Sequence, residues 1–134
     1  DDGYIKHFNL DNSELLHQIN INKEIQNMTI VEEDRLFVNA NGRFYIYNIK
    51  NNYEIKWDQS FEESELAVVV SYNTIAYGYF IMYFVEFYNE EPYNSISIHD
   101  TPFTCIVPHY NNRVISGGFD RYIAVIHLST GEKI

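Results

Sequence analysis

The sequence predicts an all-β fold built from four-stranded antiparallel sheets, and three observations support this prediction. Short segments of alternating apolar and polar residues are separated by polar turns, which is the pattern of half-buried strands. Aromatic residues, mostly Tyr and Phe, make up 16% of the chain, and their side chains favour pleated surfaces. No segment carries the apolar period of a helix over a useful length.

The chain repeats itself at an interval of about forty residues. Each repeated segment follows an apolar run and a polar turn, and precedes another apolar alternation. The aligned segments are 36–41, 75–80 and 115–120. We call the closing residues of these segments the markers, and we add Asp2, which matches them near the start of the chain. The markers are Asp2, Asn41, Phe80 and Asp120, and they are spaced by 39, 39 and 40 residues.

The elements after each marker also repeat. An alternating strand comes first, at 4–10, 43–49 and 122–128, and a polar turn follows it. A short further strand comes next, at 15–19, 54–57 and 95–98. A period near forty with four strands per unit is typical of a β-propeller.

Burial gives the physical reason for such a repeat. One four-stranded blade cannot bury both of its faces, whereas blades stacked radially cover one another. We therefore predict a partial propeller over 1–134, with the end of one blade at 1–20, blades at 21–59 and 60–98, and most of a further blade at 99–134. Both ends resemble cuts from a longer chain, so we expect an incomplete portion of a larger ring.

The uncharged run from 66 to 85 is long enough to cross a membrane as a helix. Its centre, however, carries the turn residues Tyr72 and Asn73, and the run is rich in β-branched and aromatic residues. Its flanks are acidic, where a spanning helix usually has Lys or Arg on its cytoplasmic side. We predict two buried strands joined at Tyr72 and Asn73.

The last unit, 99–134, resembles a WD40 repeat. His99 matches the histidine before the innermost strand, Ser116 the small hydroxyl residue of the second strand, and Asp120 the aspartate of the tight turn to the third strand. The resemblance implies that these three side chains form a hydrogen-bonded network across the blade. It also implies a propeller that binds proteins or peptides within a larger assembly.

The match to that family is partial. Ile126 stands where the family has a Trp, and His127 stands where its Asp follows. The middle unit has Phe80 at the marker position, and the pair Trp57 and Asp58 falls on a fourth strand. The repeat interval therefore resembles that of the family along the whole chain, whereas specific matching residues occur only in the last third.

The sequence shows no catalytic, metal or cofactor constellation. The five histidines, His7, His17, His99, His109 and His127, lack metal-ligand spacing. Cys105 lies in the apolar run 103–107, so we expect a buried, inert thiol, and a single cysteine forms no intrachain disulfide. The segment 116–118 is not a phosphate loop, because neither a Lys nor a helix follows it.

Charge and resemblance together suggest a function class. The formal net charge of −10 disfavours nucleic acid and anionic membrane surfaces as partners. We expect a non-catalytic interaction scaffold that is intracellular, in the cytoplasm or the nucleus, and completed by further blades or another chain. The turns expected at the rims are 32–35, 72–73 and 110–113. The alternatives are a substrate receptor or adaptor, as in a ubiquitin ligase, and a propeller-fold enzyme.

Overall fold

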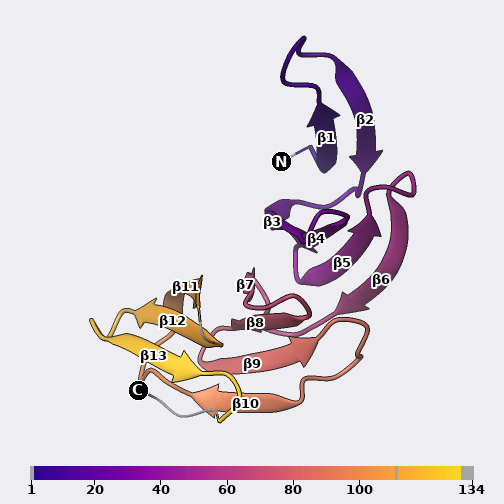
Figure 1. The fold of residues 1–134 in the computed structure, drawn as a ribbon. Coiled ribbons are helices and arrows are strands. Elements are labelled where there is room, and N and C mark those ends of the chain that lie inside the picture. The colour runs from indigo at the N-terminus through magenta and orange to yellow at the C-terminus, as the bar shows by residue number, and fades with distance from the viewer. Residues whose placement is uncertain (1, 111, 131–134) are drawn as a thin grey trace.

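The computed structural model describes residues 2–110 and 112–130, and the regular elements of that part of the chain are thirteen strands (Figure 1). Positions 131–134 of the last predicted blade lie outside the described residues. The strands form four antiparallel sheets in which neighbours in sequence are neighbours in the sheet.

The first sheet contains β1 (Tyr4–Phe8) and β2 (Leu15–Asn20). The second contains β3 (Ile25–Val31), β4 (Arg35–Ala40), β5 (Arg43–Asn48) and β6 (Glu54–Ser60). The third contains β7 (Leu66–Val69), β8 (Thr74–Gly78), β9 (Ile81–Glu86) and β10 (Asn94–Ser97). The fourth contains β11 (Phe103–His109), β12 (Arg113–Gly118) and β13 (Ile123–His127).

The sheets follow one another along an arc (Figure 1). The first strands β3, β7 and β11 lie on the inner side of the arc, and β7 contacts both β3 and β11. The later strands of each sheet lie progressively further out. This radial order of consecutive antiparallel sheets is the arrangement of propeller blades.

Alternating side chains of one strand enter different apolar layers, because successive residues of a strand point to opposite faces of the sheet. Leu36, Val38 and Ala40 of β4 pack in the layer between the first and second sheets. Phe37, between them in sequence, packs in the layer between the second and third sheets. Both faces of the central sheets are thus covered, which explains why β4 and β8 are buried along nearly their whole length.

An aromatic cluster holds the second and third sheets together. The Phe44 ring meets the rings of Phe37 and Tyr77 edge-on, each with its centroid 5.4 Å away. Trp57 and Phe61 extend the cluster towards the outer side, at 6.4 and 5.1 Å from Phe44. Offset and edge-on contacts of this kind add to the stabilisation that burial provides.

The turns between second and third strands are tight, and their residues fit them. Asn41 and Gly42 join β4 to β5 with φ angles of 50° and 81°, the left-handed region that Asn and Gly tolerate. At the equivalent turn after β8, Gly78 has a φ of 146°, and a Cβ there would lie 1.9 Å from the carbonyl oxygen of Ile81. Only a glycine fits that position.

Gly78 also corrects the prediction for residues 66–85. The turn at Tyr72 and Asn73 joins β7 to β8 as expected, but the run contains three strands, because the chain turns again after Gly78 and enters β9. Trp57 lies on β6, the fourth strand of its sheet. Among the described residues there is no helix with the length and apolar character that crossing a membrane requires.

Cys105 is exposed, and the prediction of a buried thiol is wrong. The pairing of β11 with β12 shifts between Phe103 and Cys105, so a bulge interrupts the alternation of the strand. Phe103 and Ile106 remain buried, whereas Thr104 and Cys105 both face outwards. The apolar run in the sequence did not reveal this bulge.

The aromatic cluster provides a stability prediction. Phe44 is fully buried, so Phe44→Ala is expected to lower the free energy of unfolding by about 3–5 kcal/mol, measured by denaturant titration. Phe80→Ala, at an exposed turn, is the control and is expected to change it by less than about 0.5 kcal/mol. Similar losses in both variants would contradict the packing described above.

Candidate interaction site on the marker rim

The turns between second and third strands lie on the same edge of the arc as the segments that link one sheet to the next. Two backbone hydrogen bonds show this: Phe61 N–H donates to Gly42 O at 3.1 Å, and Phe103 N–H donates to Tyr79 O at 2.9 Å. We call this edge the marker rim, because the markers Asn41, Phe80 and Asp120 lie on it. It comprises residues 41–42, 61–65, 79–80, 98–102 and 119–122.

Asn39 and Ser64 anchor one of these linkers. Asn39 is fully buried at the end of β4, and its Nδ2 donates to Ser64 O at 2.9 Å. The Ser64 Oγ in turn lies 2.6 Å from Phe61 O and 3.1 Å from Gly42 O, so its one proton is shared between these two carbonyls. These contacts hold the linker 61–65 rigidly against the β4–β5 turn.

His99, Ser116 and Asp120 anchor the next linker in the last sheet. The His99 ring lies 2.8 Å from Asp120 Oδ2 through Nδ1 and 2.9 Å from Ser116 Oγ through Nε2. His99 precedes β11, Ser116 lies on β12, and Asp120 lies in the β12–β13 turn. The structure therefore brings together the three residues singled out from the sequence.

The hydrogen-bonding partners determine the direction of these contacts. An ionised carboxylate only accepts, so His99 Nδ1 donates to Asp120. In the neutral ring, Nε2 then accepts from the Ser116 hydroxyl. Burial raises the pKa of the Asp120 carboxyl, but hydrogen bonds from the Tyr122 N–H and the His99 ring together hold that pKa below its usual value.

The order of contacts Ser–His–Asp is also that of a hydrolytic triad. Whether the serine could act as a nucleophile depends on its exposure to a substrate. Ser116 is 1% exposed within β12, and the His99 side chain has no exposed surface. A nucleophile must reach a substrate carbonyl, which this buried hydroxyl does not. The network therefore suits bracing of the turn and the linker. Among the described residues no group of three or more His, Cys, Asp and Glu side chains could hold a metal ion.

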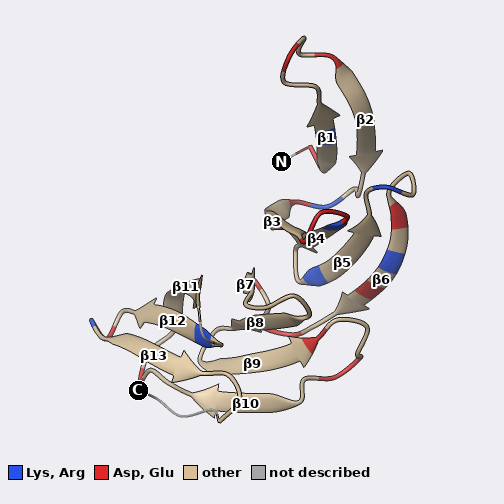
Figure 2. Ribbon diagram, in the orientation of Figure 1, with Lys and Arg blue, Asp and Glu red and all other residues tan. Residues whose placement is uncertain are grey.

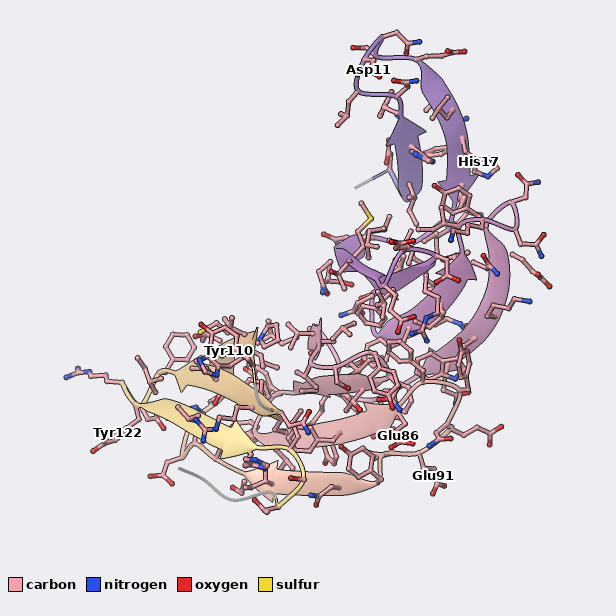
Figure 3. All side chains as sticks on the ribbon, viewed as in Figure 1. Asp11, His17, Glu86, Glu91, Tyr110 and Tyr122 are labelled. Carbon is pink, nitrogen blue, oxygen red and sulfur yellow. The ribbon has the colours of Figure 1, made fainter. Side chains whose placement is uncertain are left out.

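The outward surface of the marker rim carries large aromatic side chains. Tyr79 and Phe80 are 45% and 46% exposed and meet edge-to-face with centroids 5.0 Å apart. Phe119 and Tyr122 are 73% and 70% exposed at the next turn, and Figure 3 shows where Tyr122 lies. Exposed aromatic residues gathered on a rigid support are typical of binding surfaces.

A cavity opens beside these rings. Its volume is about 560 Å³, and its walls come from the third and fourth sheets and the linker between the second and third. Tyr79, Phe103 and Leu66 supply apolar surface, and Glu63 and Glu65 supply carboxylates. An apolar cavity with a few polar groups at its edge is what a bound side chain requires.

The opposite rim carries the turns that the sequence placed at the rims. The segments 32–34, 70–73 and 110–112 join first to second strands, and position 111 lies outside the described residues. Arg35 Nη2 donates to Tyr72 O at 2.8 Å, and the Arg35 guanidinium lies 5.3 Å from the centre of the Phe87 ring. These contacts tie two neighbouring blades together.

The comparisons with known proteins concern the fold. No protein-family model matches the chain, and neither does any curated protein. A WD40 propeller in the crystal structure of the mitotic checkpoint complex superposes with a TM-score of 0.80 over 99% of this chain, at 12% identity. Hsv2 of Kluyveromyces lactis superposes with a TM-score of 0.76 over 98%, at 10% identity. The described chain has the fold of consecutive β-propeller blades.

This chain matches only part of each of those propellers. The chain spans 44% of the length of each of these two solved chains. An Hsv2 variant with loop 6CD replaced by a Gly-Ser linker superposes similarly, with a TM-score of 0.79 at 9% identity over 44% of its length. At such low identities the likeness concerns the course of the backbone.

Sequence reasoning missed several residues of this propeller rim. Asn39 and Ser64 look like ordinary polar residues at a strand end and in a linker, and only their burial shows what they do. The pair Tyr79 and Phe80 carried a usable signal, since two large aromatics stood where a polar turn was expected. The cavity brings residues from different sheets together, which no local pattern reveals.

The buried network provides a second stability prediction. Ser116→Ala leaves His99 Nε2 buried without a partner, and is expected to cost about 1–3 kcal/mol in the free energy of unfolding. The matched control is Ser129→Ala, which removes an exposed serine–histidine contact of 2.8 Å to His127 and is expected to cost under about 0.5 kcal/mol. Equal effects in denaturant titrations would refute a bracing role.

Asp120 provides a prediction on pH. Its carboxyl has an ordinary pKa of 3.8 and a lower pKa in the folded state, so its ionised form favours folding. This stabilisation is present above the ordinary value and is lost as the pH falls through the folded value. Asp120→Asn is therefore expected to show a smaller fall in the free energy of unfolding between about pH 5 and about pH 2. The same pH dependence of the free energy of unfolding in Asp120→Asn and in the unmodified protein would contradict this role of the Asp120 carboxylate.

Proposed function

We propose that this chain is a non-catalytic protein-interaction scaffold that binds protein or peptide partners through the marker rim. The observation that carries the proposal is the exposed pair of Tyr79 and Phe80 beside the cavity of about 560 Å³. Tight turns and braced linkers hold these groups in place, so binding costs little ordering of the surface. Such preorganised aromatics commonly dominate the energetics of protein interfaces.

In this proposal the burial of Ser116, which is 1% exposed, favours a structural over a catalytic role for that residue. The serine–histidine–aspartate contact is buried, and its geometry serves the β12–β13 turn. In this proposal His99, Ser116 and Asp120 form the structural network of the blade.

Charge indicates which partners the rim favours. The linker 61–65 contains Glu62, Glu63 and Glu65, and it contains no Lys or Arg. With a formal net charge of −10, the chain attracts basic protein surfaces and repels phosphate backbones and anionic lipid surfaces. We therefore propose protein or peptide partners, and an intracellular location in the cytoplasm or nucleus.

We further propose that further blades complete the ring, with blade divisions at 1–20, 21–59, 60–98 and 99–134. The outermost sheets support this, since their outward faces expose apolar side chains. Leu15 and Leu16 are 45% and 51% exposed in the first sheet, and Ile123 is 78% exposed in the last. Between the middle sheets the corresponding positions are covered.

A selection experiment tests the rim. Peptides selected from a phage-displayed library on the purified protein are expected to lose about tenfold or more in affinity for the Tyr79→Ser/Phe80→Ser variant, measured by fluorescence anisotropy. The control is Tyr110→Ser, which removes a 79% exposed ring on the opposite rim and is expected to leave affinity unchanged. Binders that ignore the double variant, or respond equally to the control, would overturn the proposal.

A further inference from the structure

A second cavity lies between the second and third sheets, and it shares Glu63 of the marker rim with the first cavity but is not lined by Tyr79 or Phe80. Its volume is about 620 Å³. It is bounded by the end of β6 with the linker that follows, by β8 and β9, and by the loop between β9 and β10. Figure 1 shows that loop rising beside the end of β6. A cavity of this size accommodates a ligand or several side chains.

Four glutamates surround this cavity, from two separate segments. Glu62 and Glu63 come from the β6–β7 linker, and Glu90 and Glu91 come from the β9–β10 loop. Figure 2 shows acidic residues on that loop, and Figure 3 labels Glu91 on it. No Lys, Arg or His lines the cavity, and among the described residues none of the four carboxylates forms an ion pair.

Arg43, a basic residue on the adjoining strand β5, is already engaged. Arg43 donates to the carboxylate of Asp58 and, through Nη1, to Ser60 Oγ at 2.9 Å. It alternates with Phe44 along β5, so it faces the first sheet whereas Phe44 faces the third. The chain therefore does not neutralise this cavity from within its described part.

Tyr77 and Tyr83 add an independent observation. Their rings stack with centroids 5.4 Å apart and both line the cavity. Tyr77 is 3% exposed, packed against Phe44 and Phe61, yet its hydroxyl has no hydrogen-bond partner among the described residues. Its oxygen is not fully enclosed by protein atoms, and Tyr77 lines the cavity, so we infer that the hydroxyl opens on the cavity. Burial raises the pKa of Tyr77, so its phenol stays neutral.

We propose that this cavity binds an arginine side chain of a peptide partner. A guanidinium carries five donors in a planar fork, so it can meet carboxylates on two sides and the Tyr77 hydroxyl at once. Its flat face can stack on the partly exposed ring of Tyr83, which a compact ammonium group does less well. The site deepens the proposed scaffold function, on which it rests, by adding a charge-selective position separate from Tyr79 and Phe80.

Three matched peptides test the site on the purified protein. Each is a fluorescently labelled nine-residue chain of Gly and Ser with two central Arg, Lys or Gln residues. The Arg peptide is expected to bind at least about threefold more tightly than the Lys peptide, and the Gln peptide is expected not to bind, by anisotropy at low ionic strength. Equal binding of the Lys peptide, or binding of the Gln peptide, would overturn the assignment.

Variants locate the binding. Glu90→Gln/Glu91→Gln is expected to weaken the Arg peptide about tenfold, and Tyr77→Phe about threefold through loss of one hydrogen bond. Asp11→Asn/Glu14→Gln removes two charges from the distant β1–β2 turn and is the control, expected to change affinity less than about twofold. An equal loss in the control, or full affinity in the Glu90→Gln/Glu91→Gln variant, refutes the site, provided that thermal denaturation shows each variant folded.

The two proposals fail separately. Tyr79→Ser/Phe80→Ser changes no residue that lines the inter-sheet cavity, so it is expected to spare binding of the Arg peptide while weakening that of rim-selected peptides about tenfold or more. Glu90→Gln/Glu91→Gln is expected to weaken binding of the Arg peptide and to leave unchanged the binding of rim-selected peptides that lack Arg. Loss of Arg-peptide binding in the Tyr79→Ser/Phe80→Ser variant would show that the peptide binds the rim, and would overturn the cavity assignment.

Discussion

The structure depends on the burial of each sheet face by the neighbouring sheet. Along β4, β5 and β8, consecutive residues enter different apolar layers, so each central sheet belongs to two layers at once. Neither layer exists without the next sheet, since an isolated four-stranded sheet would leave one face in water. Stability is therefore a property of neighbouring pairs of sheets, and the aromatic cluster around Phe44 is one such contact, between the second and third sheets.

This stacking fixes where function can reside. Most strand side chains are buried between sheets, so side chains that can bind a partner are confined to turns, linkers and the spaces between sheet edges. The marker rim and the cavity beside Tyr77 differ accordingly. The rim displays aromatic rings on tight turns, whereas the cavity forms where two sheets diverge at their outer edge and two acidic segments approach. Hydrogen bonds of Asn39, Ser64 and the His99 network attach the linkers 61–65 and 98–102 to the neighbouring turns.

Much of the fold was predictable from the sequence, because the repeat encodes it at several levels. The interval near forty residues, the alternation in 43–49 and the turn residues Asn41 and Gly42 all indicate the same arrangement. Prediction failed where geometry outweighs pattern. Cys105 is exposed because of a bulge, and the three strands within 66–85 depend on the left-handed φ of Gly78. His99, Ser116 and Asp120 were identified by resemblance, whereas Tyr77 and the acidic loops required coordinates, since they are distant in sequence.

The sheets use different means to solve one structural problem, the attachment of a linker to the turn beside it. The last sheet uses a histidine between a serine and an aspartate, whereas the second sheet uses Asn39, Ser64 and the carbonyl of Gly42. Ile126, which the sequence resemblance places where WD40 repeats carry a Trp, is fully buried in the last sheet. Since burial of alternating side chains specifies the sheet, the bracing hydrogen bonds can change identity from blade to blade. That interchangeability explains how a chain with 9–12% identity to solved propellers retains their backbone course.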